Sequence, residues 1–276
     1  MKKIAVIISL MFTWSLAIFA SNLQAEQKVL TKSAQSKLTR CDTHEVRCAK
    51  TVTSAFAPDG RLWRLWASKN ALFIAKSDDQ GVTFMPARRV DIADEAISSR
   101  GENRPKIAFD SKNGVYLSWS SPLEKRFTAN VRFTYSADGE HFIPTKTVNL
   151  DGLLTGHSFN EMHVDQQGLV SLIWLDRRQA VYAKSRGEDY QGSAIYLAQG
   201  KVVNNDIKFS NRLLVDNTCV CCRLAMDSNV TNNLALAWRH IYGDNIREFA
   251  LLTLVQGENV QQAPYQISYD HWKING

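Results

Sequence analysis

The sequence lacks the features that would divide the chain or place it in another structural class. It has no low-complexity tract and no proline- or serine-rich linker, and only 6 of its 276 residues are proline. No window shows the apolar spacing of a convincing amphipathic helix, which disfavours α/β folds. Beyond the first twenty residues no apolar run is long enough to span a bilayer. These absences leave one large all-β domain, or two small ones.

Strong charge of either sign is also missing. The formal net charge is +6, and it falls to +4 (31 basic minus 27 acidic residues) without Lys2 and Lys3. The basic residues are scattered and do not form a stripe, so no nucleic-acid partner is expected.

The amino terminus has the pattern of a secretory signal peptide. A basic start, Met1-Lys2-Lys3, precedes the apolar run from Ile4 to Ala20, and Leu23-Gln24-Ala25 resembles a small-residue cleavage site. We therefore expect a cleaved leader over residues 1–25 and a mature domain over residues 26–276, periplasmic or secreted. An uncleaved membrane anchor is the alternative. After cleavage no stable membrane anchor is expected.

Four segments of the chain share one pattern, in which an apolar pair and an acidic or turn residue lead to an alternating strand that ends in tryptophan. They begin at Ala55, Ile107, Met162 and Leu224, and their tryptophans are Trp66, Trp119, Trp174 and Trp238, spaced 53, 55 and 64 residues apart. A third strand follows each one, over residues 71–75, 131–135, 194–198 and 249–255. A fourth strand is visible in the first two units, at residues 88–90 and 145–150.

Four antiparallel strands per 50–60 residues predict the blades of a β-propeller, with the tryptophans packed between blades. A β-sandwich with accidental internal similarity is the alternative.

Two turns follow third strands, Ser77-Asp78-Asp79-Gln80-Gly81-Val82-Thr83-Phe84 and Ser136-Ala137-Asp138-Gly139-Glu140-His141-Phe142. Asp and Ser side chains can bond backbone N–H groups nearby, and Gly supplies positive φ. The turns resemble the Asp-box (BNR repeat) of sialidase-type propellers, the second being one residue shorter. The resemblance gives a structural role on the outer rim of a blade to Ser77, Asp79, Gly81, Phe84, Ser136, Asp138, Gly139 and Phe142.

A narrower resemblance covers most of the mature chain. Gly101-Glu102-Asn103-Arg104-Pro105, Trp174-Leu175-Asp176-Arg177-Arg178, Cys219-Val220-Cys221-Cys222-Arg223 and Trp238-Arg239-His240 resemble motifs of a bacterial family of exported sialidase-like propellers without an established activity. The resemblance implies six blades and a Cys-Pro-His-His segment after Gly276. About four blades fit in this chain, so we expect it to be a truncated propeller; an unusual closed ring of four blades is the alternative. The resemblance also favours a non-catalytic binding or interaction protein, with a glycan or a metal ion as ligand.

Exo-α-sialidase chemistry is one alternative function. It needs arginines that converge on the substrate carboxylate, and Arg104, Arg178 and Arg239 fall at comparable places in three successive blades. The alternative is that these arginines bond strand ends or carboxylates such as Glu102 and Asp176. His157 and Glu161, before the third blade, either line the channel or fix a loop.

The five cysteines are Cys41, Cys48, Cys219, Cys221 and Cys222. In an exported protein disulfides are expected, and Cys41 could pair with Cys48. A disulfide between adjacent Cys221 and Cys222 is strained, so we expect the clustered thiols to pair elsewhere or to bind a metal. Cys219, Cys221, Cys222 and His240 are candidate ligands for Cu or Zn, as in a periplasmic metal-handling protein. Redox-active thiols are a further alternative.

Overall fold

The structure of the protein, a computed structural model, describes residues 44–255 and 263–274. The expected leader and Cys41 lie outside the described residues. The chain divides into two compact units after Cys48. In the described part of the first unit, the secondary structure is the short 3-10 helix η1 (Val46–Cys48). In the described residues no helix is both long enough and apolar enough to cross a membrane.

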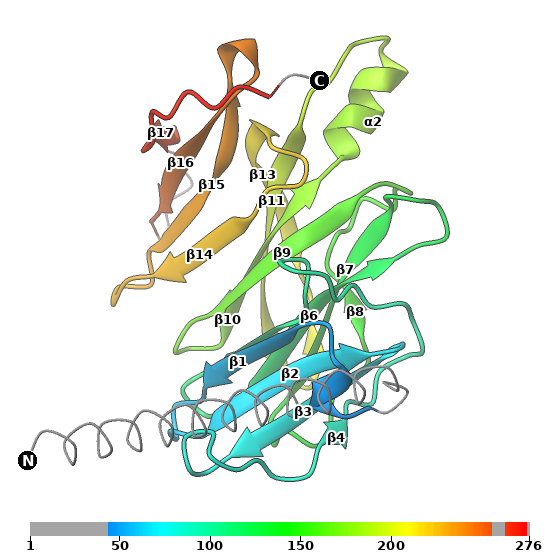
Figure 1. Ribbon diagram of the computed structural model, residues 1–276, viewed down its shortest axis with the longest axis vertical. Coiled ribbons are helices and arrows are strands. Elements are labelled where there is room, and N and C mark those ends of the chain that lie inside the picture. The colour runs from blue at the N-terminus through cyan, green and yellow to red at the C-terminus, as the bar shows by residue number, and fades with distance from the viewer. Residues whose placement is uncertain (1–43, 256–262, 275–276) are drawn as a thin grey trace, which may run out of the picture. The chain divides into compact units, whose positions relative to one another are not determined.

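Within the described part of the second unit, the strands form four antiparallel blades, which confirms the predicted propeller architecture (Figure 1). The first two blades are separate sheets with strands in chain order. They consist of β1 (Val52–Phe56), β2 (Leu62–Ser68), β3 (Ala71–Ser77) and β4 (Arg88–Arg89), then β5 (Lys106–Phe109), β6 (Val115–Pro122), β7 (Ala129–Ser136) and β8 (Lys146–Thr147).

The third and fourth blades are joined into one sheet by a single bridge between Thr218 and His240. The third consists of β9 (His157–Val164), β10 (Leu169–Asp176), β11 (Ser193–Val203) and β13 (Ser210–Thr218), with β12 (Asp206–Ile207) paired to the end of β11. The fourth consists of β14 (Leu224–Ser228), β15 (Leu234–Tyr242), β16 (Ile246–Leu254) and β17 (Tyr265–Gln266). The 3-10 helix η2 (Gly243–Asn245) links β15 to β16.

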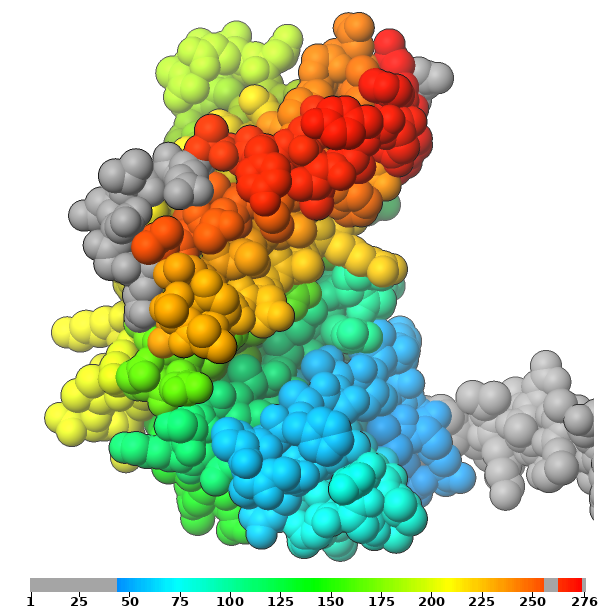
Figure 2. Space-filling model, turned by 90° about the vertical axis from the view of Figure 1, so that its left-hand side faces the viewer, coloured from blue at the N-terminus to red at the C-terminus, as the bar shows by residue number. Residues whose placement is uncertain are grey.

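Successive blades pack face to face through three apolar clusters. Both faces of the middle strands are therefore buried, which explains their near-continuous apolar sequences; in β10, Trp174 faces the second blade while Ile173 faces the fourth. None of the four repeat tryptophans is more than 1% exposed, as expected for side chains packed between blades. In the space-filling view the first blade (blue and cyan) lies at the bottom and the fourth blade (orange and red) lies toward the top (Figure 2).

The turn between the first and second strands is built alike in the last three blades. Oδ1 of Asp110 accepts hydrogen bonds from the backbone N–H groups of Lys112 and Gly114, each at 2.9 Å. Asp165 and Asn229 hold the corresponding turns in the same way. This is the usual Asx-turn bonding, and it starts the second strand at a fixed residue.

One element was not expected from the sequence. Helix α2 (Arg178–Ser185) lies in the connection from β10 to β11. Only Arg178 and Ala183 of its eight residues are buried, so its sequence carries no apolar stripe that could have indicated a helix.

Candidate functional site

The first strands of the blades, β1, β5, β9 and β14, lie in a row, each in contact with the next. At the carboxyl ends of these strands, side chains of all four blades line a cavity of about 530 Å³. Most of the residues that line it are apolar, including Phe56, Ile107 and Met162, while His163 and Asp227 are polar. The buried Nε2 of His163 has no hydrogen-bond partner in the described residues, and burial lowers the pKa of this histidine.

Charged side chains lie at or just before the starts of β5 and β14, and a further one, Glu161, lies in the middle of β9. We call this set the strand-start cluster, and it consists of Glu102, Arg104, Lys106, Glu161 and Arg223. The Lys106 ammonium and the Glu161 carboxylate form an ion pair between β5 and β9, with side chains 11% and 26% exposed. Burial raises the pKa of Glu161, although the charges of Lys106 and Arg104 act in the opposite direction.

Arg223 and Glu102 form a second ion pair in the cluster, which ties the cysteine-rich link to the loop before β5. Arg104 is exposed and makes no hydrogen bond or ion pair with any described residue. The cluster therefore has three cationic and two anionic groups, and Arg104 is the cation left without an ion-pair partner among the described residues. Such an arrangement can bind an anionic group of a ligand.

Arg178, an expected member of an arginine ring, instead belongs to a buried ionic network. Its Nη2 donates to Oδ2 of Asp176 at 2.7 Å, and its Nε lies 3.2 Å from Oδ2 of Asp151. Burial alone would lower the pKa of Arg178, but hydrogen bonds and charges from the two carboxylates raise it. The guanidinium also stacks 3.8 Å from the ring centre of Tyr196. Arg178 therefore follows the alternative in which the arginine bonds a carboxylate such as Asp176 and does not face the channel.

His157 belongs to the same network and is fully buried. Its Nδ1 lies 2.7 Å from the carbonyl oxygen of Ala129, and its Nε2 lies 2.9 Å from Oδ2 of Asp151. Both ring nitrogens therefore face acceptors, which fixes the chain before the third blade. Asp151, His157 and Asp176 come close enough together to suggest a metal site, but the Arg178 guanidinium already supplies the cation there.

Arg239 is held away from the strand-start cluster by the fourth blade itself. Its Nη1 donates to the carbonyl oxygen of Arg247 at 2.7 Å, and its guanidinium lies 4.1 Å from the ring centre of Phe249 and 4.8 Å from that of Trp272. Among the described contacts of Arg104, Arg178 and Arg239, none joins one of these arginines to another. The structure thus places Arg178 and Arg239 in structural roles and leaves only Arg104 exposed and unpaired.

The cysteine cluster differs from the expectation in its pairing. Cys219 and Cys222 form a disulfide within the cluster, so the prediction that the clustered thiols pair elsewhere is wrong for these two. A Cu or Zn site with three thiolate ligands would require this bond to be reduced. His240 is not part of the group; it lies between Trp238 and Tyr242, and burial lowers its pKa.

The two serine–aspartate turns are closed by their own side chains. Oγ of Ser77 donates to Oδ1 of Asp79 at 2.6 Å and accepts from the N–H of Gly81 at 2.8 Å. The hydrogen bonds from Ser77 and Thr83 lower the pKa of Asp79 to about 2. Ser136 and Asp138 make the equivalent bond at 2.8 Å. Both turns follow third strands, β3 and β7, and so lie away from the first strands that line the cavity.

Lys106 is the cluster member that sequence reasoning missed. The sequence predicts Arg104 from its place near the end of an inner strand, whereas Lys106, two residues further on at the start of β5, forms its ion pair with Glu161 of β9. Arg104 lies before β5, so no strand periodicity links the two residues, and the sequence carries no signal of the ion pair between Lys106 and Glu161.

No family model matches the sequence, and no curated protein matches it. Solved structures are similar to it in fold. The α-L-arabinanase of Penicillium chrysogenum, complexed with arabinobiose, aligns with a TM-score of 0.56 and 12% identity, over 83% of this chain and 69% of that one.

The GH93 α-L-arabinofuranosidase of Fusarium graminearum aligns with a TM-score of 0.52 and 14% identity in its arabinobiose complex, over 79% of this chain and 66% of that one. Its complex with an iminosugar inhibitor gives a TM-score of 0.53 and 14% identity, over 80% and 67%. This chain therefore spans about two thirds of the length of these structures. At such low identity, the likeness places this chain among proteins of the propeller fold.

Proposed function

We propose that this protein is an exported carbohydrate-binding propeller that holds an anionic glycan at the strand-start cluster without cleaving it. The observation that carries the proposal is Arg104, an exposed guanidinium with no partner in the described residues, beside the half-buried Lys106–Glu161 ion pair. A guanidinium binds a carboxylate through two parallel hydrogen bonds, so a sugar acid suits the site. The solved structures of similar fold include two that hold arabinobiose, which supports a sugar as ligand.

The absence of cleavage is argued from the carboxylates of the cluster. Glycosidases use two carboxyl groups, one on each side of the bond that breaks. Here Glu161 is paired with Lys106 and Glu102 is paired with Arg223. A carboxylate held by a cation is a weak nucleophile and a poor proton donor.

Isothermal titration with 3′-sialyllactose and digalacturonate tests the proposal. We expect binding of at least one of these acids, weakened at least about tenfold by Arg104→Ala, which corresponds to loss of a charge-assisted hydrogen-bond pair. Arg89→Ala is the matched control, because Arg89 is also exposed but lies on β4, the last strand of its blade. Equal affinity in both variants, or no binding of either acid, would overturn the proposal.

Glycoside hydrolysis is the second candidate function, and one observation favours it. Burial raises the pKa of Glu161, as is typical of the general acid in such enzymes. Release of the fluorophore from 4-methylumbelliferyl sialoside or arabinofuranoside, abolished by Glu161→Gln, would establish this function in place of simple binding.

Export and the wider family remain parts of the same proposal. We infer that residues 1–25 are removed, so that amino-terminal sequencing of the protein from a periplasmic or secreted fraction should begin at Glu26. The serine–aspartate turns support the sialidase-type lineage, because their Ser and Asp side chains bond backbone N–H groups within each turn.

A further inference from the structure

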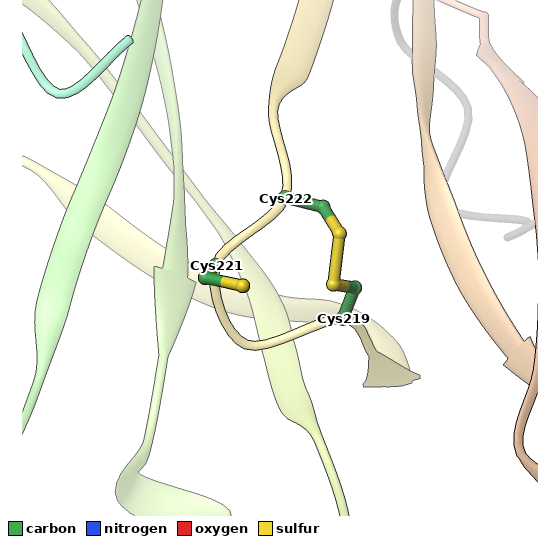
Figure 3. Close-up of side chains that lie close together, drawn as sticks. All are labelled: Cys219, Cys221 and Cys222. Carbon is green, nitrogen blue, oxygen red and sulfur yellow. A yellow bond between two sulfur atoms is a disulfide. The ribbon is translucent and has the colours of Figure 1, made fainter. Parts of the chain in front are cut away.

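Three sulfur atoms lie together in the link between β13 and β14. Cys219 and Cys222 form a disulfide, and the sulfur of Cys221 lies within 4.8 Å of both of theirs. Figure 3 shows the Cys221 side chain pointing toward the disulfide. Cys221 is exposed and carries a thiol, whereas Cys219 is only 3% exposed. A thiol thus stands beside a disulfide with which it can react.

A buried positive charge interacts electrostatically with Cys221. Arg247, at the start of β16, is 8% exposed, and its buried Nε and Nη1 have no hydrogen-bond partner among the described residues. The electrostatic interaction of Arg247 with Cys221 raises the pKa of the guanidinium, while burial lowers it more strongly. Nη2 of Arg247 donates to Oδ1 of Asn245, but its buried Nε and Nη1 lack acceptors in the described part of the chain, which favours an anion nearby.

We propose that Cys219, Cys221 and Cys222 form a thiol–disulfide exchange centre that reacts with low-molecular-weight disulfides. In the internal step, the Cys221 thiolate attacks Sγ of Cys219. The Cys219–Cys221 bond forms as the Cys219–Cys222 bond breaks, and the electron pair leaves on Sγ of Cys222, which becomes the thiolate. Attack on Cys222 is disfavoured, because a disulfide between adjacent residues is strained.

In the external step, the thiolate at Cys221 or Cys222 attacks one sulfur of the substrate disulfide. A mixed disulfide forms with one half of the substrate, and the other half leaves as a thiolate. The substrate is the only oxidant that this step requires. The internal step lets the reactive thiol move between two positions while one disulfide always remains closed.

The internal step can be followed in one tryptic peptide. Trypsin cleaves after Arg212 and after Arg223, and the peptide of residues 213–223 contains all three cysteines. The folded protein is labelled with N-ethylmaleimide, then reduced, alkylated with iodoacetamide and digested. We expect the maleimide on Cys221 in some molecules and on Cys222 in others, with the Cys222 fraction growing as the incubation pH rises. Label on Cys221 alone at every pH would overturn the exchange.

The external step is tested with oxidised glutathione on the full chain. We expect one glutathione on this peptide in the wild type and none in Cys221→Ser, in which the remaining two cysteines stay paired. Arg247→Gln should slow the reaction, because it removes the positive charge that interacts with Cys221, whereas Arg89→Gln should leave the rate unchanged. Equal rates in wild type and Arg247→Gln, or glutathione on the Cys221→Ser peptide, would contradict the proposal.

Discussion

Nη2 of Arg178 donates a hydrogen bond of 2.7 Å to Oδ2 of Asp176, between side chains that are 8% and 0% exposed. Oδ2 of Asp176 also accepts a 2.7 Å hydrogen bond from Nε1 of Trp174, a tryptophan of the inter-blade core. The ion pair is therefore built into the packing of the third blade on the second. Its arginine is committed to the fold and is not available to a ligand.

Replacing Arg178 with methionine should destabilise the protein strongly. The variant leaves Asp151 and Asp176 buried without their cation, and breaking a buried pair from one side costs about 3–5 kcal/mol. Unfolding in urea, followed by tryptophan fluorescence, should show a lower midpoint. An unchanged midpoint would mean that the network contributes nothing to stability.

Arg186→Met is the matched control for this variant. Arg186 also pairs with a carboxylate two residues away in sequence, Glu188, but both side chains are more than half exposed. Exposed pairs are screened by water and contribute little. The urea midpoint of this variant should therefore stay close to that of the wild type.

The blades could be predicted from the sequence because their signals are local. Each repeat tryptophan and each strand pattern recurs at nearly the same interval, and the turn aspartates Asp110 and Asp165 hold the turns expected of them. In the fourth blade Asn229 makes the turn hydrogen bonds, although the acidic residue of the repeat that begins at Leu224 is Asp227. Asp227 lies inside β14, because that strand runs one residue further.

The candidate site could be predicted only in part, because side-chain partners depend on contacts across strands. The positions of the arginines near strand ends were visible, but the stacking of Arg239 on Phe249 and Trp272 was not. Likewise, the sequence placed three thiols in four residues without showing that Cys219 and Cys222 pair. Lys106 became visible only through its ion pair with Glu161 in the next blade.

A second prediction concerns Gly139, where the second serine–aspartate turn meets the first blade. A Cβ at this position would lie 2.6 Å from Cη2 of Trp63, and φ is +73°. Gly139→Ala should cost about 1 kcal/mol for the backbone and a further 1–3 kcal/mol for the clash with this buried tryptophan. Gly60→Ala isolates the backbone effect, because φ of Gly60 is +83° and no other atom would lie within 4 Å of the added Cβ. Equal urea midpoints for the two variants would contradict the predicted contact.

A third prediction follows from the pKa of Asp79, which its turn lowers from 3.8 to about 2. A carboxyl group with a depressed folded-state pKa stabilises the protein above pH 3.8, and this contribution is lost as the pH falls toward 2. Asp79→Asn should therefore lower the melting temperature slightly at neutral pH, and the difference from wild type should shrink on acidification. The effect is small because the side chain is exposed. A difference that grows on acidification would have the wrong sign.

A fourth prediction concerns the ion pair in the strand-start cluster. Burial raises the pKa of Glu161 and the charge of Lys106 opposes this increase. Lys106→Met should therefore raise that pKa further, because the adjacent opposite charge is lost. The free energy of unfolding should then fall as the pH rises through the new pKa, because ionised Glu161 is left buried without its cation.

Carbon-13 NMR of the Glu161 carboxyl group measures the shift in pKa directly, and urea unfolding at several pH values measures its effect on stability. Lys112→Met is the matched control, because Lys112 is an exposed lysine in the turn that follows the same strand, β5. It should leave the titration of Glu161 unchanged. A Glu161 that titrates alike in wild type and Lys106→Met would show that burial alone sets its pKa, and that Lys106 does not stabilise the carboxylate.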